Sequence, residues 1–272
     1  MSNMNDDFTM SYMDSCDKMP LLLIHGFPLD SSMWELQFQD MGDVTRLIAP
    51  DLRGHGLSET TDKYDMGQLA ADCAGLLDSM GIHVPVVVCG LSMGGYVALE
   101  FYRRYPERVA GLVLASTRAG ADSADGKKGR DEMITAVSKD PQTIANTMLP
   151  KFFTPKTIAE DEELVGYVND IMLNNSAEGM ISALTAMKER ADSTPLLAEI
   201  AVPTLIIHGE EDQLIPLSEA ELMLNSIPDA ELAIIADAAH LPNLEQPEPF
   251  NDAIMDFLEM LTGDVHEHHD HD

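Results

Sequence analysis

The sequence has few basic residues. Of its 272 residues, 16 are Lys or Arg and 47 are Asp or Glu, so the formal net charge is -31 and the pI is near 4.3. A surface this acidic repels the phosphates of nucleic acids, and we therefore expect no nucleic-acid partner. The negative electrostatic potential of the whole protein also disfavours strongly anionic substrates, although a few well-placed arginines would be enough to make the potential positive locally.

Cysteine and long apolar runs are also scarce. The three cysteines, Cys16, Cys73 and Cys89, are odd in number and include no CxxC pair, so they form no disulfide framework. Cys73 and Cys89 fall inside apolar patterns, and we expect both to be buried as small hydrophobes. No stretch approaches the roughly 20 apolar residues of a membrane span, and the first residues lack the features of a secretion signal. We therefore expect a cytoplasmic protein.

The apolar residues, 45% of the chain, fall into short continuous runs that alternate with helical patterns. This alternation is typical of βαβ units around a mostly parallel sheet, and continuous runs such as LLLI and VVV indicate strands covered on both faces. The predicted strands span 20–25, 45–49, 85–89, 109–115, 203–208 and 230–235, with an antiparallel strand over 8–13. Helices are predicted over 66–80, with Asp65 as N-cap, and over 248–261.

The alternation stops after the strand at 109–115, where helical patterns rich in methionine and phenylalanine replace strands. We interpret residues 118–195 as a helical insertion in one α/β core formed by 1–117 and 196–262. Met and Phe at helical spacing more often belong to a core than to a ligand pocket. Trp34, outside the insertion, either lines a pocket or anchors the following helix. The candidate pocket residues are Trp34, Met148, Phe152 and Phe153.

An acidic, histidine-rich tail over 263–272 ends the chain with VHEHHDHD. Imidazoles clustered among carboxylates are able to hold Zn, Ni or Cu. Terminal segments are usually loose, however, and such clusters bind metals opportunistically. We therefore expect a solvated tail and predict no physiological metal site.

The sharpest local pattern is CGLSMGG, which follows the apolar run PVVVC and precedes a helical pattern. Gly90, Ser92 and Gly94 fit GxSxG. In a tight strand-to-helix turn, glycines on both sides of the serine let the flanking chain pass closely, and the hydroxyl is presented at a helix N-terminus. GxSxG occurs by chance when isolated, but between a strand and a helix it predicts Ser92 as a nucleophile.

A serine nucleophile needs a base and an acid that orients the base. In chain order after the serine, the acid should follow one strand and the histidine the next. His240 follows the strand at 230–235 and is the candidate base. The candidate acids are Glu210, Glu211, Asp212 and Asp237.

The tetrahedral oxygen formed by attack of a serine needs two backbone N–H donors. Met93 directly follows the serine and supplies one candidate. Phe27 follows the strand at 20–25, in the sequence HGF, and supplies the other.

Five segments carry a resemblance to a known family: HGFPLDSSMW, DLRGHGLSE, GLSMGGYVALEFYRRYPERVAGLVLAST, PTLIIHGEEDQLIP and AAHLPNLEQP. They resemble the α/β-hydrolase superfamily, especially its small carboxylesterase and 3-oxoadipate enol-lactonase-like members, over roughly residues 20 to 260. The resemblance implies an α/β-hydrolase fold with a mostly parallel, eight-stranded sheet flanked by helices and a helical cap at 118–195. It implies the triad Ser92, Asp212 and His240, because GxxDxxxP selects Asp212 among the acids. It also implies an oxyanion hole formed by the N–H groups of Phe27 and Met93.

This machinery predicts acyl transfer to water by a serine-dependent carboxylesterase or lactonase that needs no cofactor. The expected partner is a small ester or lactone with a small to medium acyl group. Serine in place of a carboxylate at position 92 disfavours dehalogenase and epoxide hydrolase chemistry. The same triad would also serve an enol-lactonase, a perhydrolase or cofactor-free haloperoxidase, or a lyase of the menaquinone-synthesis type. A slow-turnover ligand receptor is an alternative from a different class, and the sequence leaves the oligomeric state open.

The excess of acidic residues leads to a hypothesis of adaptation to a saline environment. Self-repulsion of such a surface destabilises the fold at low ionic strength, and counterions relieve it. We expect the melting temperature to rise by several degrees between low-salt buffer and molar NaCl in a thermal unfolding experiment. A melting temperature that does not rise would leave solubility as the reason for the acidic surface.

Overall fold

One sheet of seven strands organises the protein, in the order β1-β3-β2-β4-β5-β6-β7. The computed structural model describes residues 8–15, 18–61 and 63–263, so Cys16 and the histidine-rich tail beyond 263 lie outside the described residues. The strands are β1 (Tyr12–Asp14), β2 (Pro20–Ile24), β3 (Arg46–Pro50), β4 (Val86–Leu91), β5 (Val109–Ala115), β6 (Thr204–Gly209) and β7 (Ala230–Ile235). All neighbouring strands are parallel except β1 and β3.

The six strands predicted from continuous apolar runs correspond to β2 to β7, with ends displaced by at most two residues. Every residue of β2, β4 and β6 is buried, as expected for parallel strands that carry helices on both faces. Cys73 and Cys89 are also fully buried, as predicted for small hydrophobes. The continuous apolar runs of the sequence therefore form the centre of the core.

The eight-stranded sheet implied by the resemblance is wrong for the described residues, which form seven strands. The strand predicted over 8–13 is the antiparallel edge strand β1, but it covers only Tyr12–Asp14. Just before β1 the backbone pairs with the loop after β3. Asp51 N–H donates to Ser11 C=O at 2.9 Å, and Glu59 N–H donates to Thr9 C=O at 3.3 Å. The backbone of Thr9 and Ser11 thus pairs with this loop, and the described residues form no strand before Tyr12.

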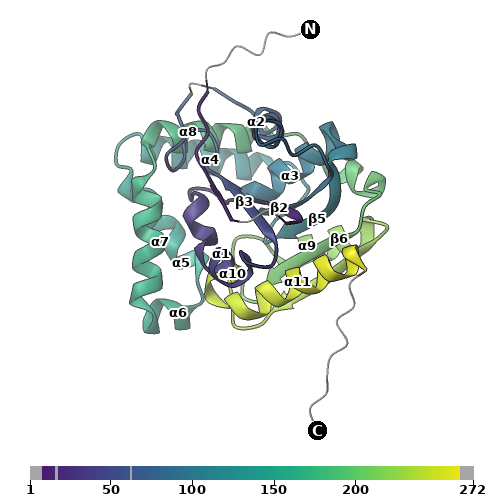
Figure 1. Cartoon of the computed structure of the whole chain (residues 1–272). Helices are drawn as coiled ribbons and strands as arrows, with labels where there is room; N and C mark the ends of the chain where they lie inside the picture. The colour runs from purple at the N-terminus through teal and green to yellow at the C-terminus, as the bar shows by residue number, and fades with distance from the viewer. Residues whose placement is uncertain (1–7, 16–17, 62, 264–272) are drawn as a thin grey trace.

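Helices cover both faces of the sheet (Figure 1). The pair α2 (Met66–Ser79) and α3 (Met93–Arg104) packs together on one face, and the pair α1 (Glu35–Met41) and α11 (Pro247–Thr262) on the other. The short α10 (Pro242–Glu245) precedes α11, and α9 (Leu217–Ser226) packs against β6 and β7. The two helices predicted from apolar spacing are α2 and α11. Asp65 caps α2 as predicted, because its carboxylate accepts Gln68 N–H at 2.7 Å.

All elements between β5 and β6 are helical, and the structure describes every residue of this segment. They are α4 (Ala124–Val137), α5 (Gln142–Phe152), α6 (Pro155–Glu160), α7 (Glu162–Asn174), α8 (Ala177–Glu189) and the 3-10 helix η3 (Thr194–Glu199). Here α4 packs against α8, while α5 and α6 pack against α7, and α5 to α7 stand together at the left of Figure 1. The division into a core and a cap remains a prediction.

Two buried histidines join the loops that follow β2 and β3. His25 donates from Nδ1 to Gly26 C=O at 2.9 Å and accepts Leu52 N–H at Nε2 at 3.0 Å, which fixes its neutral tautomer. The ring of His55 lies 5.0 Å from that of His25, and its Nδ1 donates to Arg53 C=O at 3.0 Å. Burial lowers the pKa of both, and for His55 burial together with the adjacent His25 lowers the pKa to about 3. Both imidazoles are therefore structural and neutral.

Because the folded protein holds His55 neutral, acid should destabilise it. The unfolded chain binds this proton at the ordinary pKa of 6.5 and the folded protein only at about 3, so stability is fully present above pH 6.5 and declines as the pH falls towards 3. We expect His55→Gln to reduce the slope of melting temperature against pH in this window. Gln142→Ala, which changes an exposed side chain without an ionisable group, should leave the slope unchanged. A His55→Gln slope equal to that of the wild type would contradict the assignment.

Candidate active site

Ser92 lies at the turn between the middle strand β4 and helix α3. Its backbone adopts φ 55° and ψ -112°, a strained conformation that costs about 1–3 kcal/mol. A Cβ on Gly90 would lie 2.1 Å from Gly94 O, and a Cβ on Gly94 would lie 2.1 Å from Ile24 O. Glycine is therefore required at both positions by close backbone packing. The turn places Ser92 immediately before the N-terminus of α3.

Asp212 lies in the loop after β6, and its two carboxylate oxygens have separate partners. Oδ1 accepts the backbone N–H groups of Leu214 at 2.8 Å and Ile215 at 3.0 Å. Oδ2 lies 2.8 Å from Nδ1 of His240. Two hydrogen bonds from its own loop thus hold the carboxylate in the position where it meets the imidazole.

His240 lies in the loop after β7 and links the other two side chains. Its Nε2 lies 2.9 Å from Ser92 Oγ, while its Nδ1 faces Asp212. Because a carboxylate only accepts, Nδ1 carries the proton and Nε2 is the free base that faces the hydroxyl. The structure therefore brings together the three side chains that the sequence predicted as a triad, in hydrogen-bonded order.

The alternative acids lie elsewhere. Glu210 and Glu211 are exposed at the start of the same loop as Asp212. Asp237 is also exposed, at φ 53°, and its carbonyl accepts a hydrogen bond from Gln246 Nε2 at 3.3 Å. Asp212 is the acid whose carboxylate reaches His240.

The charge of Asp212 is stabilised although its side chain is fully buried. Burial by itself raises the pKa, but the charge and hydrogen bond of His240 and the N–H groups of Ile215 and Leu214 hold the pKa of Asp212 below its ordinary value. His208 lies 3.9 Å from the carboxylate and is not a charged partner, because burial lowers its pKa. Its Nε2 donates to Ile215 C=O at 3.0 Å, which braces the same loop.

Phe27 and Met93 occupy the positions predicted for the two N–H donors. Met93 is the first residue of α3, where a backbone N–H has no acceptor within the helix. Phe27 follows β2, the neighbour of β4, and lines the same cavity as Ser92 and His240. Strand order reverses between β2 and β4, and ligand sites of parallel sheets form at such switch points. The oxyanion hole itself remains a prediction.

A cavity of about 90 Å³ opens beside Ser92 and His240. Its wall combines Met148, Met187 and Leu214 with Tyr96 and two arginines, Arg118 and Arg130. Met148 is thus the one predicted pocket residue that lines it.

The pocket role predicted for Trp34 and Phe153 requires correction, because both side chains are fully buried in the core and neither lines the cavity. The ring of Trp34 packs against Phe250 of α11 with centroids 6.3 Å apart. Of the two roles considered for Trp34, the structure therefore supports that of an anchor for the helix that follows it.

The inserted helices hold the loop of His240 directly. Phe152, at the end of α5, stacks its ring on the imidazole with centroids 5.4 Å apart, and its carbonyl accepts His240 N–H at 3.1 Å. Phe152 therefore supports the base and does not line the cavity. Glu245 forms a second link, since its carboxylate accepts Ala239 N–H at 2.6 Å and Thr154 N–H at 2.8 Å. The position of His240 depends on contacts with the insertion.

Sequence reasoning missed the contacts of Phe152 and Glu245 and the two arginines of the cavity. The sequence around Glu245 does not indicate its role, because an acidic residue between a leucine and a glutamine is equally typical of a solvent-exposed loop. The only feature of the sequence that could have drawn attention to the two arginines is that basic residues are rare, since the chain has only 16 Lys and Arg. Arg118 and Arg130 both lie in the segment whose pattern carried no functional motif.

In the part of the chain that the structure describes, His, Cys, Asp and Glu form no group of three or more able to hold a metal ion. The predicted absence of metal from the histidine-rich tail concerns residues outside that part. None of the described helices combines the length and the apolar character needed to cross a membrane.

Residues 21–253 match the model of the alpha/beta hydrolase family, and the chain belongs to this family. It is similar to 3-oxoadipate enol-lactonase 2 from Acinetobacter baylyi, with 31% identity over 239 residues that cover 88% of each chain. It is similar in structure to a thermophilic esterase from Thermogutta terrifontis (malate bound), with a TM-score of 0.92, 38% identity and 96% of each chain covered. The enol-lactonase from Burkholderia xenovorans gives a TM-score of 0.86 at 26% identity, over 92% of this chain and 96% of that one. The predicted family and fold are confirmed.

Removal of the Glu245 carboxylate should destabilise the protein. Glu245→Ala leaves the N–H groups of Ala239 and Thr154 and the hydroxyl of Thr157 without their acceptor, which should cost about 2 kcal/mol. We expect a lower melting temperature for this variant, and little change for Glu221→Ala at an exposed position of α9. Equal melting temperatures for the two variants would show that the link contributes nothing to stability.

Proposed function

We propose that the protein is a serine carboxylic-ester hydrolase that acts on small to medium acyl esters or lactones through an acyl-enzyme. The observation that carries this proposal is the hydrogen-bonded chain from Ser92 Oγ to His240 at 2.9 Å and from His240 to Asp212 at 2.8 Å. A hydroxyl bonded to an imidazole that a buried carboxylate orients is arranged for deprotonation and attack on a carbonyl carbon.

In the first half-reaction, Ser92 Oγ attacks the carbonyl carbon of the ester while His240 Nε2 accepts the hydroxyl proton. The N–H groups of Phe27 and Met93, together with the N-terminus of α3, stabilise the negative charge on the carbonyl oxygen. Asp212 holds the imidazole tautomer and stabilises the imidazolium. The imidazolium then gives its proton to the leaving alcohol, and the acyl group remains on Ser92.

In the second half-reaction, water attacks the acyl-enzyme while His240 accepts one of its protons. The tetrahedral intermediate collapses, the proton returns to Ser92 Oγ, and the carboxylic acid leaves. One ester and one water give one acid and one alcohol. The residues of the chain carry every proton transfer, and no cofactor takes part.

A lactone is a second candidate substrate because its ring contains the same acyl–oxygen bond. Relatives from Acinetobacter baylyi and Burkholderia xenovorans are named enol-lactonases, and the Thermogutta terrifontis relative is named an esterase. With a lactone the acyl and alcohol parts leave as one product, a hydroxy acid, or a keto acid when the alcohol is an enol. Both candidates therefore require the same hydrogen-bonded chain.

Hydrolysis of 4-nitrophenyl esters, from acetate to decanoate, should depend on Ser92. We expect Ser92→Ala to lower kcat close to the uncatalysed rate, because among the described residues no other hydroxyl forms a hydrogen bond with His240 Nε2. Asp212→Asn should lower kcat by roughly 10⁴-fold, because an amide favours the wrong imidazole tautomer. Ser218→Ala, at an exposed position of α9, is the matched control and should keep wild-type rates.

Nitrophenol release that persists in Ser92→Ala would refute the proposal. Rapid, Ser92-dependent opening of a lactone together with slow turnover of every ester would assign the lactone as the better substrate. The measurement is steady-state release of nitrophenol at its absorption maximum and, for lactones, proton release followed with a pH indicator.

A further inference from the structure

Two arginines line the cavity that contains Ser92 and His240. Arg118 follows β5, and Arg130 lies on α4, so they reach the cavity from the first part of the inserted segment. Their position is unusual in a chain with 47 acidic and only 16 basic residues. Few cations are present, and two of them face the reaction site.

These arginines share one carboxylate with a third. The carboxylate of Asp122, whose side chain is 1% exposed, accepts hydrogen bonds from the guanidinium groups of Arg118 at 2.7 Å and Arg130 at 3.1 Å. It also accepts a hydrogen bond from the guanidinium group of Arg190 at 2.7 Å. In the described residues no other carboxylate lies within ion-pair distance of any of the three guanidinium groups. Burial lowers the pKa of Arg118, but Tyr96, Asp122 and the more distant Glu219 together raise it above its ordinary value. Within ion-pair distance three positive charges share one negative charge, while the carboxylates of Glu219 and Asp192 lie further away.

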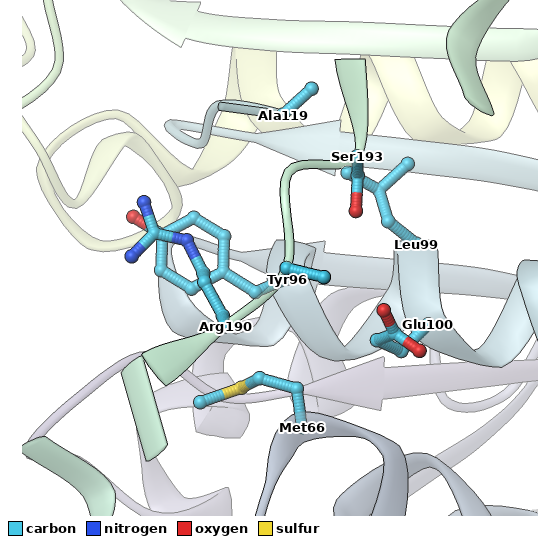
Figure 2. A pocket seen from close by; sticks show the side chains of 8 residues that line it. Met66, Tyr96, Leu99, Glu100, Ala119, Arg190 and Ser193 are labelled. Atoms are coloured by element: carbon cyan, nitrogen blue, oxygen red, sulfur yellow. The ribbon is translucent and has the colours of Figure 1, made fainter. Parts of the chain in front are cut away.

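Arg190 has a structural role that accounts for its charge. Its guanidinium lies 4.0 Å from the centre of the Tyr96 ring, a contact visible in Figure 2. It also donates to Met187 C=O at 2.8 Å and to Gly120 C=O at 2.7 Å. Only 3% of its side chain is exposed, so Arg190 ties the end of α8 to the segment after β5.

Arg118 and Arg130 line the cavity and have guanidinium N–H groups beyond the ones that Asp122 accepts. Arg118 donates from Nη2 to Asp122, lies beside the hydroxyl of Tyr96, and keeps 26% of its side chain exposed at the cavity wall. Arg130 uses Nε for Asp122, and its side chain is 20% exposed at the cavity wall. A partly desolvated guanidinium with spare N–H groups binds a carboxylate in paired hydrogen bonds.

We propose that Arg118 and Arg130 form a carboxylate-binding subsite, so that the preferred substrate is an ester or lactone that bears a free carboxylate. The identity of the scissile bond rests on the proposed function, whereas binding of the carboxylate does not. Met148, Met187 and Leu214 share the wall and suit a short methylene chain between the two groups. Because the cavity is only about 90 Å³, the chain joining carboxylate and carbonyl is short. The acidic surface elsewhere does not oppose this local binding, because salt screens distant charges.

The test compares monomethyl succinate with dimethyl succinate, which differ by one charge at nearly the same size. Initial rates are followed by proton release from a pH indicator. We expect the wild type to favour the monoester by about tenfold or more in kcat/KM, because a hydrogen bond to a charged group contributes that much discrimination. Arg130→Gln should lower the ratio of the two kcat/KM values about tenfold, and Arg118→Gln should act in the same direction.

Lys128→Gln is the matched control, because it removes one positive charge from the same helix at a side chain that is 76% exposed. It should leave the ratio unchanged. Each variant is checked for folding by its melting temperature, since both arginines bind buried Asp122. A second measurement needs no variant: succinate should inhibit hydrolysis of 4-nitrophenyl acetate by the wild type competitively, and the neutral diamide succinamide should not.

Failure of this inference differs from failure of the proposed function. Ser92-dependent hydrolysis of both esters with equal efficiency, without inhibition by succinate, would overturn the subsite and leave the hydrolase intact. Absence of turnover with either ester, together with calorimetric binding of succinate that Arg130→Gln weakens about tenfold, would support the subsite and overturn the hydrolase.

Discussion

The backbone turn at Ser92 is the constraint on which the site depends. Its positive φ of 55° is held because β4 is the middle strand and α3 packs back against it, with the backbone of Gly94 against Ile24 of β2. The free-energy cost of this strained backbone is small compared with the free energy gained by burying the apolar side chains around β4, so the fold tolerates it. The same turn directs the hydroxyl towards His240 and leaves the first N–H of α3 without a helical acceptor.

The loop of His240 is positioned from two sides. Asp212 fixes the imidazole from the core, through a carboxylate that its own loop holds by two hydrogen bonds. Phe152 and Glu245 fix the loop from the insertion, by ring stacking and by backbone hydrogen bonds. The helices between β5 and β6 therefore help to position the base, because a shift of α5 would move His240 relative to Ser92.

Charge is distributed unevenly between the surface and the site. The chain as a whole carries a formal charge of -31, yet the cavity wall presents arginines whose shared partner is one buried aspartate. Exposed charges further away than a Debye length of about 10 Å are screened at ordinary ionic strength, whereas the partly buried cluster is not. Net charge is consequently a poor guide to what this cavity binds.

Local patterns in the sequence determined much of this protein. Continuous apolar runs placed β2 to β7, helical spacing placed α2 and α11, and GxSxG placed the turn at Ser92, because each depends on neighbours in the chain. Resemblance supplied the choice of Asp212 and the count of eight strands, whereas the described residues form seven, with Thr9 and Ser11 paired to the loop after β3. Only the tertiary structure decided that Trp34 and Phe153 are core, that Phe152 supports His240, and that Arg118 and Arg130 meet at the cavity. These outcomes depend on packing between residues far apart in the chain, which no local spacing encodes.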